Sequence, residues 1–496
     1  MANKLIHLML VLCLMFLSCT GKKKKVIYIG SGITAGINAT DPATESYPAQ
    51  LAALLGEDYV MENYGVSGST IFRAGNQSYW NTEEYQKALA GNPDIVFISL
   101  GDNDSRLINQ SQPDILEKDC RVMIRSFATL PSNPRIILLT PTLSFNNDST
   151  GICNETILHK INPLIWTAAG REGVEVIEMH PGTKGADKVA YEMYQYLMAN
   201  PTYSNVVLPK NPFITHMYTA DPSAHVWEDG RLYVYPSHDI SPARGCDLMD
   251  RYHIFSTNDM VNWKDHGEIF SSADVPWGRP EGGFMWAPDC AYKDGTYYYY
   301  FPHPSESYTN NSWKVGIATS SKPAEGFTVL PDYVKGLESL IDPCVFRDDD
   351  GQYYFYQGGG SVCKGAKLKD NMMEIEGELQ LMEGLEDFHE GAWVFKRNGV
   401  YYLTYADNHT DGDKYNRMRY AVSDNPLGPW KYAGIYLDST NCYTIHGSVV
   451  KYKGQWYAFY HNNDLSGGNH GERSICVDKL YFNLDGTIRK VFQTKN

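Results

Sequence analysis

The chain has 496 residues, 13% of them aromatic with 36 tyrosines, and a formal net charge of −15. This length accommodates two or three domains with full cores. The acidic balance argues against nucleic acid or an anionic membrane surface as the main partner, and it is compatible with a neutral polymer such as a polysaccharide.

Residues 1–19 have the features of an export signal. Lys4 precedes the apolar run 5–16, which is too short to form a stable membrane span. The segment Leu17-Ser18-Cys19 resembles the lipobox of bacterial lipoproteins. That resemblance implies that Cys19 carries a lipid and that the exported protein is held at a bacterial membrane through this anchor alone. The alternative is an ordinary cleaved signal in which the cysteine is incidental.

The remaining cysteines are scattered and include no C-x-x-C pair, which argues against a zinc site or thioredoxin-like chemistry. Their scatter is not typical of a disulfide framework. It leaves open whether a few bridges form and which cysteines they join.

Residues 20–200 alternate between strand and helix patterns. Short apolar strands are predicted at 26–29, 94–100, 135–140 and 174–177, and helices at about 46–55, 113–130 and 155–171. This alternation predicts an α/β domain with a doubly wound parallel sheet. In such a fold we expect a site in the loops that follow the carboxyl ends of the strands.

These loops resemble the SGNH, or GDSL-like, esterase family. Residues 63–68 read Asn-Tyr-Gly-Val-Ser-Gly, residues 101–104 read Gly-Asp-Asn-Asp, and a His-Pro pair follows the fourth strand. The resemblance implies that Gly68 and Asn103 are oxyanion donors and that His180 is the catalytic histidine.

The domain departs from this family at the nucleophile. The family's first block is Gly-Asp-Ser-x-Thr, whereas residues 30–34 read Gly-Ser-Gly-Ile-Thr. Gly32 therefore stands at the nucleophile position, where it has no side chain to attack an ester. Ile177 stands where the family places the Asp that orients the histidine. We expect the domain to be inactive as an esterase and to contact carbohydrate or act as a spacer. The rival interpretation is a rearranged esterase that uses Ser31 with His180.

Residues 201–212 form a proline-containing linker, and residues 213–496 change to the alternating pattern of strands. Five similar units follow, each with an Asx-Gly or Lys-Gly hairpin turn. The turn glycines are spaced 48 to 65 residues apart, at Gly230, Gly295, Gly351, Gly399 and Gly454. Repeats of this length predict an all-β propeller with five blades, none of which could bury its aromatic faces alone.

The units share a position that lies eight or nine residues before the turn glycine and is occupied by Asp221, Ala287, Asp342, Glu390 and His446. Because the first strand of each blade lines the central channel, we expect these residues to ring one opening. Cleavage of a glycosidic bond uses one protonated and one ionised carboxyl, and a third carboxylate can raise the pKa of the acid. The residue types therefore predict a glycoside hydrolase site.

The repeat resembles glycoside hydrolase family 43, whose members are five-bladed propellers that act with inversion on arabinose-, xylose- or galactose-containing polysaccharides. The matching segments are 220–223, 286–289, 341–343, 389–391 and 446–448. The resemblance implies that Asp221 is the general base, Glu390 the general acid and Asp342 the residue that tunes and orients the acid.

The same resemblance extends to three further residues. It implies that Trp286 is a sugar-stacking wall. It also implies that His446 binds the substrate and can help to hold a calcium ion in the channel through water. Arg473 is either a ligand of the substrate or part of a structural ion pair. The resemblance implies that no cofactor is required, and a structural calcium ion is the metal that it suggests.

We therefore predict an exo- or side-chain-acting glycosidase that releases α-L-arabinofuranose or β-D-xylose from plant polysaccharide, with galactosyl-type linkages as a further option. The alternatives are a carbohydrate esterase that acts through residues 20–200 and a polysaccharide-binding lipoprotein without activity. Loop shape decides the sugar, the linkage and the endo or exo mode, so the repeat leaves these open, as it does the oligomeric state.

Overall fold

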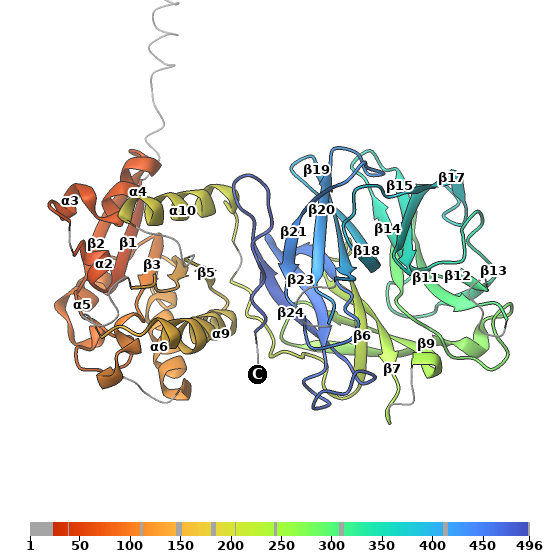
Figure 1. The fold of residues 1–496 in the computed structure, drawn as a ribbon, viewed down its shortest axis with the longest axis horizontal. Helices are drawn as coiled ribbons and strands as arrows, with labels where there is room; N and C mark the ends of the chain where they lie inside the picture. The colour runs from red at the N-terminus through yellow and green to blue at the C-terminus, as the bar shows by residue number, and fades with distance from the viewer. Residues whose placement is uncertain are drawn as a thin grey trace, which may run out of the picture. The chain divides into compact units, whose positions relative to one another are not determined.

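The computed structural model describes residues 23–494 except 38, 110–112, 145–150, 180–184, 204, 243–245, 307–311 and 410–414 (Figure 1). The chain forms two compact units. The first extends to Ala169 and includes Val174–Met198, and the second consists of Gly170–Gly173 and the residues from Ala199 onward. The predicted export signal with Cys19 and the predicted His180 lie outside the described residues. None of the described helices is long and apolar enough to cross a membrane.

The first unit is built on a five-stranded parallel sheet in the order β2-β1-β3-β4-β5. The strands are β1 (Lys24–Gly30), β2 (Tyr59–Gly65), β3 (Ile95–Ser99), β4 (Arg135–Leu139) and β5 (Glu175–Ile177). The helices are α2 (Gly32–Ala35), α3 (Pro42–Glu45), α4 (Tyr47–Leu55), α5 (Glu83–Ala90), α6 (Pro113–Ala128), α8 (Asn154–Thr156), α9 (Asn162–Glu172) and α10 (Ala186–Ala199). This architecture confirms the predicted α/β fold.

Strand β2 is the one strand of this sheet that the sequence pattern does not predict. It lies at the edge of the sheet, pairs only with β1 and has no fully buried residue, so it lacks the apolar run of its neighbours.

The strand order places β1 beside β3. In a parallel sheet of this kind, the loops that follow such neighbouring strands meet at the carboxyl edge. Residues 31–32 and 102–103 come together there, as the hydrogen bond between Ser31 and Asp102 shows.

The second unit consists of five antiparallel sheets, each made of consecutive strands (Figure 1). The strands of the first two blades are β6 (Tyr218–Val226), β7 (Leu232–Asp239), β8 (Arg251–Thr257), β9 (Trp263–Ser271), β10 (Asp289–Lys293), β11 (Thr296–Pro304), β12 (Trp313–Ser320) and β13 (Thr328–Tyr333). The third and fourth blades contain β14 (Ile341–Arg347), β15 (Tyr353–Gly359), β16 (Val362–Leu368), β17 (Ile375–Leu381), β18 (Phe388–Arg397), β19 (Val400–Asp407), β20 (Met418–Ser423) and β21 (Lys431–Leu437). The fifth blade contains β22 (Ser448–Tyr452), β23 (Gln455–Asn462) and β24 (Ser474–Leu480). The predicted five-bladed propeller is confirmed.

Aromatic side chains fill the spaces between neighbouring blades. Tyr235 of the first blade packs edge-on against Tyr299 of the second, with ring centroids 5.8 Å apart. Tyr300 of the second blade packs in the same way against Phe355 of the third at 5.8 Å. A further buried cluster joins the first blade to the fifth. Because each core is shared between blades, each blade depends on its neighbours for stability.

Seven described cysteines form no disulfide: Cys120, Cys153, Cys290, Cys344, Cys363, Cys442 and Cys476. The spacing of the cysteines left open whether some of them form disulfide bonds, and the structure shows that these seven do not.

Candidate active site

The first strands of three blades are interrupted at their carboxylate residues. The pairing register shifts at Asp221 in β6, at Asp342 in β14 and at Glu390 in β18. Asp221 and Asp342 have φ angles of 50° and 52°, and Gly391, which follows Glu390, has a φ of 70°. Bulges re-aim side chains, and residues other than glycine with positive φ are uncommon outside turns and functional sites. The backbone therefore turns each carboxylate out of the regular strand pattern.

The carboxylate of Asp221 is buried and hydrogen-bonded on both oxygens. Ser237 Oγ donates to Oδ2 at 2.7 Å, and Arg473 Nη1 donates to Oδ1 at 3.1 Å. His461 accepts the backbone N–H of Asp221 on Nδ1 at 3.1 Å and donates from Nε2 to the carbonyl oxygen of Thr444 at 2.9 Å. Burial lowers the pKa of His461 to about 4, so this imidazole is neutral at pH 7 and its two contacts fix one tautomer.

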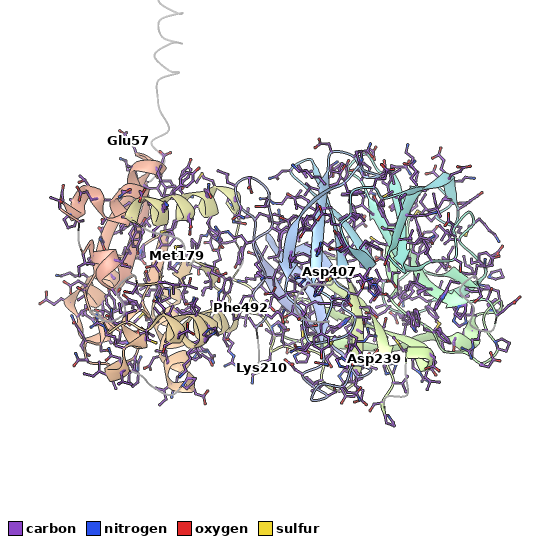
Figure 2. All side chains as sticks on the ribbon, in the orientation of Figure 1. Glu57, Met179, Lys210, Asp239, Asp407 and Phe492 are labelled. Carbon is purple, nitrogen blue, oxygen red and sulfur yellow. The ribbon has the colours of Figure 1, made fainter. Side chains whose placement is uncertain are left out.

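Arg473 joins Asp221 to a second buried carboxylate, that of Asp239. Asp239 ends β7 and is labelled in Figure 2. Its Nε and Nη2 donate to the two oxygens of Asp239, each at 2.9 Å, and its backbone N–H donates to the same side chain at 2.8 Å. Its Nη1 also donates to Thr444 Oγ1 at 3.3 Å. The structure shows the ion pair, with all three guanidinium nitrogens in contact with protein acceptors, and a substrate contact of Arg473 stays a prediction.

The three carboxyl groups have pKa values that are displaced in opposite directions. Burial alone would raise the pKa of Asp221. The charge of Arg473, together with His461, His446 and the hydrogen bond from Ser237, outweighs burial, and this pKa falls to about 2. Burial raises the pKa of Glu390, against the opposing effect of His389, and the charge of Asp221 adds to the rise. Burial, followed by the charges of Glu390 and Asp221, raises the pKa of Asp342 well above its ordinary value. At neutral pH Asp221 is ionised, while the other two retain protons more strongly than ordinary carboxyls.

Asp342 and His446 both lie against the backbone beside Glu390. The Oδ2 atom of Asp342 accepts the Gly391 N–H at 3.1 Å. A Cβ atom at Gly391 would lie 3.0 Å from the ring of His446, so the close approach as well as the positive φ requires glycine here. Burial lowers the pKa of His446, and the charge of Asp221 opposes this. The structure thus brings together the four charged or titratable residues that the sequence places at one opening.

Trp286 lies close to the same carboxylates. Its ring is partly exposed and lies 4.6 Å from the ring of Trp313. Tyr252 donates its hydroxyl to the backbone carbonyl of Trp286 at 2.6 Å. The pKa of the Tyr252 phenol is raised well above its ordinary value, first by burial and then by the charges of Asp221 and Asp342. Tyr252 therefore connects the aromatic pair of Trp286 and Trp313 to the carboxylates.

Asp289 links the first strands of three blades. It accepts hydrogen bonds from Ser223 Oγ at 2.5 Å, from His225 Nε2 at 2.7 Å and from the backbone N–H of Val345 at 2.6 Å. These contacts occupy both carboxylate oxygens of Asp289. Among the residues that the structure describes, no group of three or more His, Cys, Asp or Glu side chains is arranged to hold a metal ion. The side chains therefore do not fit a directly ligated calcium ion, and a water-held one stays a prediction.

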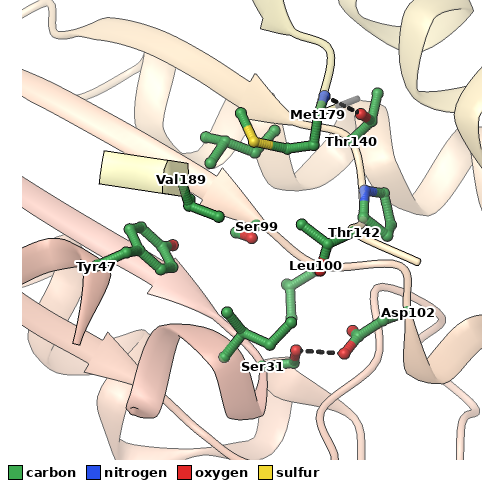
Figure 3. A pocket seen from close by; sticks show the side chains of 12 residues that line it. Ser31, Tyr47, Ser99, Leu100, Asp102, Thr140, Thr142, Met179 and Val189 are labelled. Carbon is green, nitrogen blue, oxygen red and sulfur yellow. Dashed lines mark hydrogen bonds between the residues drawn. The ribbon is translucent and has the colours of Figure 1, made fainter. Parts of the chain in front are cut away.

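The candidate esterase residues surround a separate cavity in the first unit. Gly32, Gly68 and Asn103 are among the residues that line this cavity of about 610 Å³. Ser31 is buried beside a smaller cavity of about 20 Å³, where its Oγ donates to Asp102 at 2.7 Å (Figure 3). Burial raises the pKa of Asp102, although the hydrogen bond from Ser31 opposes the rise. The hydroxyl of Ser31, which precedes the nucleophile position at Gly32, thus donates to a buried carboxyl.

Both units match known protein families. Residues 28–197 match the GDSL-like Lipase/Acylhydrolase family, and residues 209–488, more than half of the chain, match Glycosyl hydrolases family 43. The chain belongs to glycosyl hydrolase family 43. This family 43 protein combines a propeller glycosidase domain with a GDSL-like domain.

Relatives agree with the family assignment. The family 43 protein is 35% identical over 336 residues to xylosidase/arabinosidase 43A of Humicola insolens, which covers 56% of this chain and 98% of that protein. A similar solved structure is that of a GH43 β-xylosidase/α-arabinofuranosidase from a compost microbial metagenome in complex with xylotriose. Its sequence is 35% identical and its TM-score is 0.51, and the match covers 57% of this chain and 96% of that one. An acetylxylan esterase of Xylanibacter ruminicola is 31% identical over 199 residues, 34% of this chain and 41% of that protein. The family 43 protein is therefore a glycosidase.

Four supporting residues of the site escape the sequence reasoning: Ser237, Asp239, Asp289 and His461. Each is a polar residue within two positions of a strand end, and each is buried in the fold. A polar interruption at a strand end that faces the channel is the signal that could have revealed them, because a buried polar group requires a partner.

Proposed function

We propose that this glycosidase removes α-L-arabinofuranosyl or β-D-xylosyl residues from plant polysaccharide with inversion at the anomeric carbon. The observation that carries the proposal is the opposite displacement of two pKa values on different blades, downward for Asp221 and upward for Glu390. The names of two relatives, a xylosidase/arabinosidase and a β-xylosidase/α-arabinofuranosidase, support the choice of sugars.

In this mechanism Asp221 is the general base and Glu390 the general acid. The ionised carboxylate of Asp221 takes a proton from a water molecule, whose oxygen attacks the anomeric carbon on the face opposite to the leaving group. Glu390 gives its proton to the glycosidic oxygen while the bond from the anomeric carbon to that oxygen breaks. Exchange of protons with solvent then restores both groups. The two proton transfers need no cofactor.

Asp342 and Trp286 assist without transferring a proton to the sugar. The hydrogen bond from Gly391 to Asp342 fixes the backbone next to Glu390, so Asp342 positions the acid. Repulsion between the negative charges of Asp342 and Glu390 also favours a state in which at least one of them is protonated. Trp286 offers a flat apolar face on which a sugar ring can pack.

The acid role of Glu390 is tested by Glu390→Gln. Glutamine keeps the shape but has no proton to give, so we expect kcat/KM on xylo-oligosaccharides and arabinoxylan to fall by about 10²- to 10⁴-fold. The matched control is Glu386→Gln, which changes an exposed side chain four residues earlier and should leave the activity within twofold. A Glu390→Gln protein that keeps more than a tenth of the wild-type activity contradicts the assignment.

The base role of Asp221 is tested by removing the ion pair that lowers its pKa. With a pKa of about 2, Asp221 stays ionised over the accessible pH range. The double variant Arg473→Gln/Asp239→Asn removes the cation and its second partner together, so the pKa of Asp221 should return to about 4 or above. Because the base works only when ionised, the acid limb of the kcat/KM profile should move upward by about two pH units.

The control for this experiment removes an ion pair of the same type at a partly exposed position. Arg251→Gln/Asp250→Asn breaks a pair with a distance of 2.8 Å between Nε and Oδ1. Its profile should match that of the wild type. An acid limb that stays in place in the Arg473→Gln/Asp239→Asn protein argues against Asp221 as the base.

A second candidate function is carbohydrate ester hydrolysis by the first unit. The similarity to an acetylxylan esterase and the cavity of about 610 Å³ favour it, and the absence of a nucleophile at Gly32 opposes it. We expect the full chain to release no acetate from acetylated xylan, and Ser31→Ala to change nothing. Acetate release that Ser31→Ala abolishes would establish the rearranged esterase instead.

We further propose that the enzyme is exported and anchored to a bacterial membrane through a lipid on Cys19. The support is the apolar run followed by Leu17-Ser18-Cys19. Cys19→Ala should move the enzyme from the detergent-soluble membrane fraction to the soluble fraction and abolish labelling by a fatty-acid analogue. Equal labelling of the wild type and the variant contradicts the anchor.

A further inference from the structure

Two loops at the fifth blade, one that leads into it from the fourth blade and one within it, carry stacked aromatic rings. Tyr443 lies between β21 and β22, His470 lies between β23 and β24, and their ring centroids are 3.7 Å apart with an angle of 19° between the ring planes. Tyr415 lies 5.8 Å from the ring of Tyr443 and 5.6 Å from that of His470. Tyr443 is 53% exposed, so a large part of its ring faces solvent although it stacks on His470.

These rings adjoin the residues that hold the base. Tyr443 directly precedes Thr444, whose Oγ1 accepts from Arg473 Nη1 at 3.3 Å. His470 lies three residues before Arg473 in the chain, and Arg473 contacts Asp221 at 3.1 Å. Both members of the stacked pair are therefore close in the chain to residues of the hydrogen-bond network around Asp221.

Hydrogen bonds brace the two loops. Asn463 Nδ2 donates to the carbonyl oxygen of Asn441 at 3.3 Å, which ties one loop to the other. Within the second loop, Asn469 donates to Glu472 Oε2 at 3.2 Å and accepts the backbone N–H of Gly471 at 3.0 Å. A surface that is fixed before a ligand arrives loses less entropy when the ligand binds.

We propose that Tyr415, Tyr443 and His470, here named the rim platform, bind a pyranose ring of the polysaccharide next to the sugar that is cleaved. The chair of β-D-xylopyranose carries its hydroxyls at the equator, so its faces present C–H groups that pack on flat rings. The phenol and imidazole edges can in turn pair with hydroxyls. The proposal rests on the proposed function and adds a preference for oligomers over single-sugar substrates.

The test compares two substrates of different reach in the full-length enzyme. Xylotetraose extends beyond the cleaved sugar, whereas β-D-xylopyranosyl fluoride has a one-atom leaving group that cannot contact the rim platform. Tyr443→Ala should lower kcat/KM on xylotetraose about tenfold more than on the fluoride, mainly through KM. Tyr443→Phe, which keeps the ring, should restore most of the loss. The matched control is Tyr191→Ala, which removes a tyrosine of similar exposure (51%) from the first unit and should act like the wild type.

The outcomes separate the rim platform from the proposed function. Equal losses on the two substrates, or no loss on xylotetraose, overturn the rim platform and leave the stacked pair as a brace of the two loops. A folded wild type that hydrolyses neither substrate, nor the corresponding α-L-arabinofuranosyl fluoride, overturns the proposed function. Titration of xylotetraose into Glu390→Gln proteins with and without Tyr443→Ala then decides the binding claim by itself, because equal affinities contradict it.

Discussion

The buried guanidinium of Arg473 is the interaction on which both ring closure and the active site depend. It precedes the last strand of the fifth blade and contacts Asp221 and Asp239 of the first. Burying such a cation costs several kcal/mol unless its carboxylate partners remain in place. The contacts that join the last blade to the first therefore also hold Asp221 ionised. Burial raises the pKa of Glu390 and the negative charge of Asp221 adds to the rise, so the pKa values of the two carboxyls are displaced in opposite directions.

The two units show that a protein can keep the fold of a family without keeping all of its catalytic residues. The first unit matches the GDSL-like family and keeps a cavity at the expected edge of its sheet, yet Gly32 stands at the nucleophile position and Ser31 donates to a buried carboxyl. The propeller retains all three carboxylates, each at an interruption of a first strand. Because a fold can outlast its chemistry, the residues present at each site decide the assignment.

The sequence predicts the fold because repetition makes its signal strong. Five turns with the same strand pattern determine five blades, and the Asp-Pro steps at Asp221 and Asp342 already mark the points at which the strands are interrupted. Features that occur only once in the chain are not predicted from the sequence. Strand β2 lies at an edge of its sheet and lacks an apolar run that would predict it. No sequence motif marks Asp239, because its role follows from its contact with Arg473, 234 residues away. The pKa values also depend on burial and on charges from other blades, which only the closed ring brings together.

The central claim is that Asp221 and Glu390 cleave a glycosidic bond in one step, with water attacking opposite to the leaving group. Proton NMR of the first-formed sugar, recorded before mutarotation, tests it directly. A β-D-xyloside should release α-D-xylose and an α-L-arabinofuranoside should release β-L-arabinofuranose. Initial release of the sugar with the configuration of the substrate would show a covalent intermediate and contradict the account.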